Sequence, residues 1–91
     1  MKKRRWVAVF WEDIVGVERP WLSFQEALEV HPAPMVTLGL LLEQTKQHIL
    51  LASTLELTEG EGQIGSVCCI PRGAVLSVVD VPVPPEVPSG R

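Results

Sequence analysis

The 91-residue chain has no tyrosine, only two phenylalanines and only two cysteines, which are neighbours. Cα atoms of adjacent residues lie about 3.8 Å apart, which is less than the separation of about 4.4 Å that a comfortable disulfide needs. We therefore expect Cys68 and Cys69 to be free thiols in a reducing compartment. There is no third cysteine, and His31 and His48 stand far apart with no zinc-site spacing. The sequence predicts no bound metal and no cofactor.

Long apolar runs are also missing. The longest charge-free stretch, residues 30–42, is interrupted by His31, Pro32 and Pro34 and is shorter than the roughly 18 residues of a membrane-spanning helix. The apolar segment 6–11 behind the basic N-terminal residues is too short for the core of a signal peptide. We expect a cytoplasmic protein that does not contact a membrane.

The usual catalytic groupings are absent from the pattern. None of the five serines has the G-x-S-x-G context of a nucleophile, and the two thiols lie in an apolar segment, where cysteines tend to be inert. Glu12 and Asp13 are adjacent in a predicted strand, so their side chains point to opposite faces and cannot flank one substrate atom. The sequence predicts a protein that is not an enzyme.

Positive charge is concentrated at one end of the chain. Lys2, Lys3, Arg4 and Arg5 carry four charges, whereas residues 6–91 hold four basic and eleven acidic residues, a net charge of −7. Because phosphate contacts dominate affinity for nucleic acid, the acidic body disfavours such a partner. The N-terminal run is either a solvated end or a contact for nucleic acid.

What the chain does have is apolar material, since 46% of its residues are hydrophobic. A domain of this size buries only about 60% of the surface of its unfolded chain, which leaves apolar residues that a small monomer hides poorly. Large exposed apolar patches usually mark interfaces. We therefore expect the protein to associate with itself.

The periodicity predicts one short helix among five strands. Strands are expected at 6–13, 35–43, 47–56, 64–70 and 74–81, from β-branched and aromatic runs and from alternation such as that of Val36, Leu38, Leu40 and Leu42. Ser23 and Glu26 form a capping-box pattern that begins a helix at 24–30, and the prolines that follow end it. The predicted fold is mostly β, in the order β-α-β-β-β-β: a small bent five-stranded barrel with the helix inserted after the first strand.

The sequence therefore predicts that the chain has three parts. Residues 1–5 form a basic tail, residues 6–81 a single small β-barrel domain, and residues 82–91 a proline-rich extended tail. Trp6, Trp11 and Trp21 are either interface anchors or part of the core, because tryptophan suits both.

The apolar segment 65–81 is interrupted at Pro71-Arg72-Gly73, and this interruption predicts a turn. Ile70-Pro71-Arg72-Gly73 places proline second and glycine fourth, which is typical of a type I turn. We expect Pro71 and Gly73 to be structural.

The segments "VTLGLLLEQTKQHILLA" and "GSVCCIPRGAVLSVVDV" resemble the two sequence blocks of the Sm-like family, through Gly39 in the first and Arg72-Gly73 in the second. That family is a bent five-stranded barrel that builds rings. The whole chain, with its "FWED" and "IPRGAV", also resembles small uncharacterised bacteriophage proteins. This resemblance implies a phage-encoded protein that works in the host cytoplasm.

The Sm-like resemblance implies an alternative function, the binding of RNA or single-stranded nucleic acid. Family members that bind uridine use an Asp and an Asn in the first block, where this chain has Thr45 and Ile49. Arg72 would correspond to a base-contacting arginine, or it is simply solvated. Residues 2–5 would add contacts to phosphate.

The same resemblance implies where copies meet. In Sm-like rings the fourth strand of one subunit pairs with the fifth strand of its neighbour. The candidate interface residues are Ile64, Val67, Cys69, Val75 and Val79. The function expected is that of a non-enzymatic interaction protein, which forms a homo-oligomer such as a ring and contacts a further, unidentified protein partner.

Overall fold

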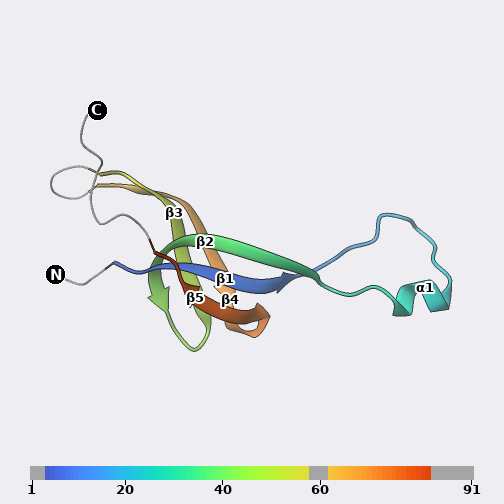
Figure 1. The fold of residues 1–91 in the computed structure, drawn as a ribbon. Coiled ribbons are helices and arrows are strands. Elements are labelled where there is room, and N and C mark those ends of the chain that lie inside the picture. Colours follow the sequence, from blue (N-terminus) through green and yellow to red (C-terminus); the bar gives the residue numbers. More distant parts are fainter. Residues whose placement is uncertain (1–3, 58–61, 83–91) are drawn as a thin grey trace.

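A computed structural model describes residues 4–57 and 62–82 of the chain. The elements are β1 (Trp6–Asp13), α1 (Phe24–Leu28), β2 (Ala33–Gln44), β3 (His48–Leu55), β4 (Ile64–Pro71), a 3₁₀ turn η1 (Arg72–Ala74) and β5 (Val75–Asp80). The expected order of one strand, one short helix and four strands is confirmed (Figure 1). No helix in the described part of the chain is both long and apolar enough to cross a membrane.

The five strands form one antiparallel sheet in the order β4-β3-β2-β1-β5. Bulges between Phe10 and Trp11 and between Leu41 and Glu43 shift the register and bend the sheet. Within the described residues, β4 pairs only with β3 and β5 pairs only with β1. The sheet is therefore open, and the expected barrel is not closed.

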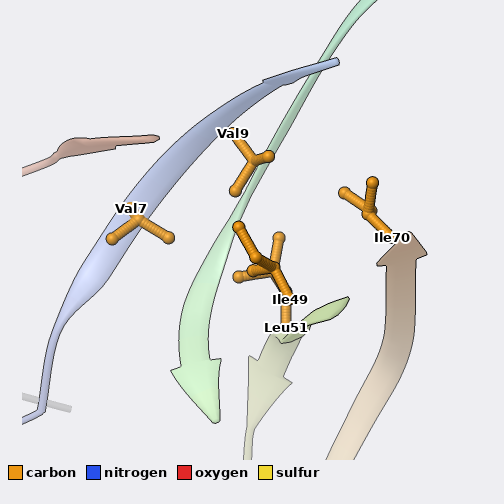
Figure 2. Close-up of a cluster of buried hydrophobic side chains, with 5 residues drawn as sticks. All are labelled: Val7, Val9, Ile49, Leu51 and Ile70. Carbon is orange, nitrogen blue, oxygen red and sulfur yellow. The ribbon is translucent and has the colours of Figure 1, made fainter. Parts of the chain in front are cut away.

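The core lies on one face of this bent sheet, which we call the inner face. Its fully buried side chains converge from β1, β3 and β4 (Figure 2). They are Val7, Val9, Ile49, Leu51 and Ile70. Alternation along the strands places them together, because directly paired residues share a face. This core is small, and it leaves most of the apolar residues of the strands outside it.

The opposite, outer face of the sheet is also apolar. Val36 and Leu38 share a face, as their parity predicts, but this face is the solvent side, and they are 51% and 55% exposed. Phe10 pairs with Val36, and Ala8 pairs with both Leu38 and Val79. Phe10, Val36, Leu38 and Val79 thus surround Ala8. We call these four residues the outer patch.

The sheet bends where Gly39 lies against β3. A Cβ atom added at Gly39 would lie 2.8 Å from the backbone oxygen of Ala52, a contact closer than real Cβ atoms make. Only glycine therefore allows β2 to approach β3 this closely.

The turn after β4 differs from expectation. Pro71 is the last residue of β4 and pairs with His48, and Arg72–Ala74 form the 3₁₀ turn. Gly73 has open space around its Cβ position and no positive φ. The space around Gly73 therefore gives no steric reason for a glycine at this position.

Residues 14–32, which we call the arm, extend away from the sheet between β1 and β2 and carry α1 at their far end (Figure 1). No residue of α1 is buried.

One residue of the predicted basic tail belongs to the sheet. The carbonyl of Arg5 accepts a hydrogen bond from the Leu41 amide at 2.8 Å.

We predict that Gly39→Ala lowers the free energy of unfolding by about 2 kcal/mol, because the new methyl group forces β2 and β3 apart. Gly73→Ala is the matched control and should change it by less than about 0.5 kcal/mol. Denaturant unfolding followed by tryptophan fluorescence measures both values. Equal effects at the two glycines would contradict this account of the bend.

Candidate interaction surfaces

The two free edges of the sheet, β4 and β5, present unpaired backbone groups. The Val81 amide donates to the Trp6 carbonyl at 2.8 Å. Since alternate residues of an antiparallel ladder face the partner strand, the N–H groups of Asp80 and Val78 point away from β1. On the other edge, the Arg72 amide donates to the Gln47 carbonyl at 2.8 Å, so the N–H of Cys69 points away from β3.

The side chains predicted to line an interface lie on these edges. Ile64, Val67 and Cys69 are exposed on β4, and Val79 is exposed on β5. Val75 differs, because it is half-buried and packs against the core. The edges therefore combine free backbone groups with uncharged side chains, apart from Asp80.

A local distortion divides the β4 edge. Ser66 has a φ of 53°, in the left-handed region that residues other than glycine rarely adopt. The regular pairing with β3 lapses here, between the pairs of Gly65 with Thr54 and of Val67 with Ala52. Such irregularities blunt a sheet edge. The edge that can accept another strand is therefore the second half of β4, residues 67–71.

The predicted nucleic-acid contacts do not come together. The guanidinium of Arg5 binds the Asp80 carboxylate at 2.9 Å, which neutralises part of the N-terminal charge, and Arg4 is exposed beside it in sequence. Lys2 and Lys3 lie outside the described residues. Arg72 precedes β5 and Asp80 ends it, so about 20 Å of strand separates Arg72 from Arg5.

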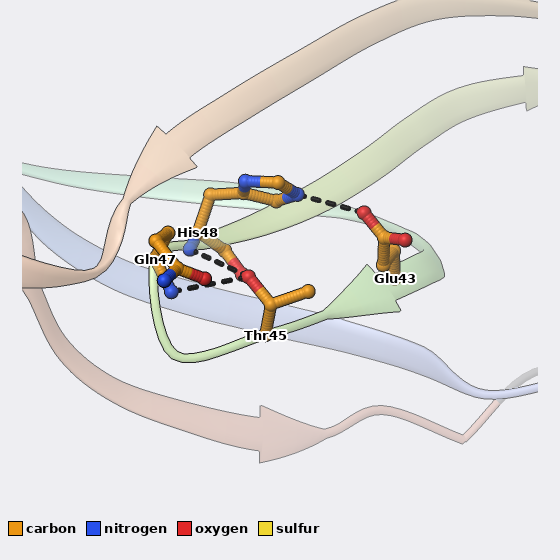
Figure 3. A network of polar contacts seen from close by, with 4 residues as sticks. All are labelled: Glu43, Thr45, Gln47 and His48. Atoms are coloured by element: carbon orange, nitrogen blue, oxygen red, sulfur yellow. Dashed lines mark hydrogen bonds and ion pairs between the residues drawn. The ribbon is translucent and has the colours of Figure 1, made fainter.

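The two positions that match the family's uridine-binding residues are both engaged in the fold. The Thr45 hydroxyl accepts hydrogen bonds from the Gln47 and His48 amides, each at 3.1 Å, and so closes the β2–β3 turn (Figure 3). Ile49 is fully buried in the core. His48 contacts Glu43 at 2.7 Å on the same turn. Neither Thr45 nor Ile49 presents a free polar group to a base.

A groove of about 550 Å³ lies where the arm leaves the sheet. It is bordered by the two ends of the arm, where the chain leaves β1 and enters β2, and by the turn before β5. The lining residues are Glu12, Asp13, Ile14, Val15, Val30, His31, Pro32, Pro71, Gly73 and Ala74. One Asp13 oxygen already accepts the Ile14 amide at 2.9 Å. The groove is thus largely apolar, with an acidic border.

The described part of the chain has few side chains with the features of a reactive site, such as a metal-ligating cluster or a displaced pKa. Residues 4–57 and 62–82 contain no cluster of three metal-ligating side chains. In the same ranges the one group with a clearly displaced pKa is Glu26, whose pKa is lowered below 4.5 by hydrogen bonds from Ser23 and by Arg19. This carboxylate belongs to the helix cap, so its displaced pKa has a structural cause.

The three tryptophans differ in how far they are buried. Trp6 and Trp11 are half-buried in β1, and the Trp11 indole N–H donates to the Thr37 hydroxyl at 2.9 Å. Trp21 is 87% exposed at the far end of the arm, beside Phe24, which is 82% exposed. The sequence reasoning missed the arm, although Gly16 and the prolines around the helix mark a segment apart from the strands.

No protein-family model matches the chain, and no curated protein or solved structure matches it significantly. The Sm-like and phage resemblances therefore depend on the residues quoted above. The fold itself defines the class: a small open antiparallel sheet with an exposed arm.

We predict that Glu26 titrates below pH 4.5 in the folded protein. A lowered pKa stabilises the cap above pH 4.5, and this stabilisation is lost as the pH falls through the lower, folded-state value. An NMR titration of the Glu26 carboxyl measures it. Ser23→Ala should move the value back towards 4.5, and Arg19→Ala should move it less. A native value at or above 4.5 would contradict the cap geometry.

Proposed function

We propose that this protein is a non-enzymatic interaction protein that assembles with copies of itself through the two free edges of its sheet. In this assembly the second half of β4 in one copy pairs with β5 of the next. The contact is head-to-tail, so repetition closes a ring where the rotation between copies permits it.

The observation that carries this proposal is the strand order. β4 and β5 are the two edges of an open sheet, and no other strand in the described part of the chain lies beside their outward-facing N–H and C=O groups. Proteins usually blunt such edges with charges, prolines or bulges. On β5 the single charged residue, Asp80, is already paired with Arg5. On β4 only Ser66 and Pro71 interrupt the edge, and the segment between them stays open.

The Sm-like interpretation fits the same arrangement. A ring would complete each bent sheet with a strand from its neighbour, and this would supply the closure that the isolated chain lacks. Under this interpretation the protein acts by presenting a repeated surface to a further protein partner. A phage origin and a location in the host cytoplasm are part of the same proposal.

Binding of nucleic acid in the Sm-like manner has no specific observation in its favour. Thr45 is engaged in a turn, Ile49 is buried, and Arg72 stands about 20 Å of strand away from Arg5. Protein contacts therefore remain the function that the geometry supports best.

We predict that the chain has a mass in solution of more than twice the 10.0 kDa of one copy, and that Cys69→Pro lowers it. Proline at position 69 removes an N–H that faces outward, so it blocks edge pairing without removing a β3–β4 hydrogen bond. Light scattering at micromolar concentration measures the mass.

Cys69→Ser is the matched control, because it removes the thiol and keeps the N–H. This variant should retain the wild-type mass, and circular dichroism should show that both variants stay folded. A folded Cys69→Pro protein with the wild-type mass would rule out pairing through this edge.

A further inference from the structure

We propose that two copies of this chain exchange arms, so that the exposed aromatic tip of each arm packs on the outer patch of the other copy. The tip consists of Trp21, Phe24 and Leu28, and the patch of Phe10, Val36, Leu38 and Val79. This contact is separate from the edge pairing proposed above, because it uses different surfaces and neither contact requires the other.

The arm tip is ordered by its own polar contacts. Ser23 and Glu26 exchange two hydrogen bonds, of 3.0 and 3.1 Å, in a complete capping box. The Arg19 guanidinium also contacts the Glu26 carboxylate at 3.2 Å. These bonds hold the polar groups together, while Trp21 and Phe24 stay exposed. The tip therefore presents two exposed aromatic side chains on an ordered backbone, and aromatic residues often anchor protein interfaces.

The outer patch offers these aromatic side chains an uncharged surface. Its four side chains are each 42–55% exposed. They are neighbours on the sheet, because Phe10 pairs with Val36, and Ala8 between them pairs with Leu38 on one side and with Val79 on the other. The four patch side chains are apolar, so they bring no charge and no hydrogen-bonding group into the contact. Ser77, which pairs with Phe10 on the same face, borders the patch with its hydroxyl.

The arm does not reach the patch of its own sheet. Pairing of β1 with β2 continues to Asp13 and Ala33, so both chains leave the sheet extended. Pro32 and Pro34 disfavour helical backbone at the residues before them, His31 and Ala33. The extended backbone at these residues directs the chain between α1 and β2 away from the sheet. Figure 1 shows the arm leading away from the strands. A second copy is therefore the partner that carries a matching surface.

The area involved favours a reciprocal exchange. An aromatic side chain buries about 150–250 Å², so Trp21 and Phe24 contribute about 400 Å² from each arm. With a similar area lost from the patch, one contact removes about 800 Å², the size of a crystal contact. Two contacts related by a two-fold axis remove about 1,600 Å², the size of a standard specific interface.

Light scattering on substituted full-length chains tests the exchange. Trp21→Ser/Phe24→Ser and, separately, Val36→Lys should each halve the wild-type mass, because each removes one side of the same contact. Val17→Ser is the matched control, since Val17 is an exposed arm residue outside the tip, and it should leave the mass unchanged. A wild-type mass retained by either the tip or the patch variant would overturn the proposal.

The same masses separate this contact from edge pairing. With both contacts present, Cys69→Pro should leave a dimer held by its arms, the tip variant should leave half of the full assembly, and the two changes together should give a 10.0 kDa monomer. If Cys69→Pro alone gives a monomer, arm exchange is overturned. If Cys69→Pro has no effect and the tip variant alone gives a monomer, edge pairing is overturned and arm exchange stands.

Cross-linking identifies which sheet the arm covers. In a chain with Cys68→Ala and Cys69→Ala, the pair Phe24→Cys and Leu38→Cys should give a covalent dimer on oxidation. Phe24→Cys alone should give none, because the two arms lie on opposite sheets. A disulfide within one chain would overturn the proposal by showing that the arm folds back on its own sheet, and the absence of any cross-link would overturn it as well.

Discussion

The structure depends on a small hydrophobic core. Its five largest fully buried side chains come from β1, β3 and β4 and lie on the inner face, and the outer face adds the buried residues Ala8, Leu40 and Ala52. In a domain of this size that core leaves little margin of stability. Gly39 permits the close approach of β2 to β3 around this core, because a Cβ there would strike the Ala52 backbone. The remaining apolar residues are left on the outer face, the edges and the arm.

The edges, the outer face and the arm all expose apolar residues because the core is too small to cover them. A five-stranded sheet that stays open has two edges, and strands that are apolar on both sides cannot bury both faces against one small core. The arm adds a third apolar surface, because its polar side chains satisfy one another and its aromatic side chains remain outside. We propose that further copies of the same chain, which carry matching surfaces, cover them.

Local patterns were sufficient to predict the elements. The capping box at Ser23 and the alternation in β2 each depend on neighbours in sequence, and both are present in the structure. Which face becomes the core could not be predicted, because Val36 and Leu38 are as apolar as Ile49 and Leu51. The open surroundings of Gly73 and the close approach at Gly39 could not be predicted either, since they depend on packing. The strain at Ser66 has no sequence signal, and the exposure of Trp21 follows from the path of the arm.

Amide hydrogen exchange, followed residue by residue at two protein concentrations, tests the central claim that neighbouring copies cover the free edges. The groups that decide it are the outward-facing N–H groups of Cys69, Val78 and Asp80, which no strand among residues 4–57 and 62–82 of the same chain protects. If copies pair through these edges, exchange at the three amides is slow at high concentration and becomes fast on dilution, while exchange in β1 and β2 is unchanged. Fast exchange at these amides at every concentration would contradict the account.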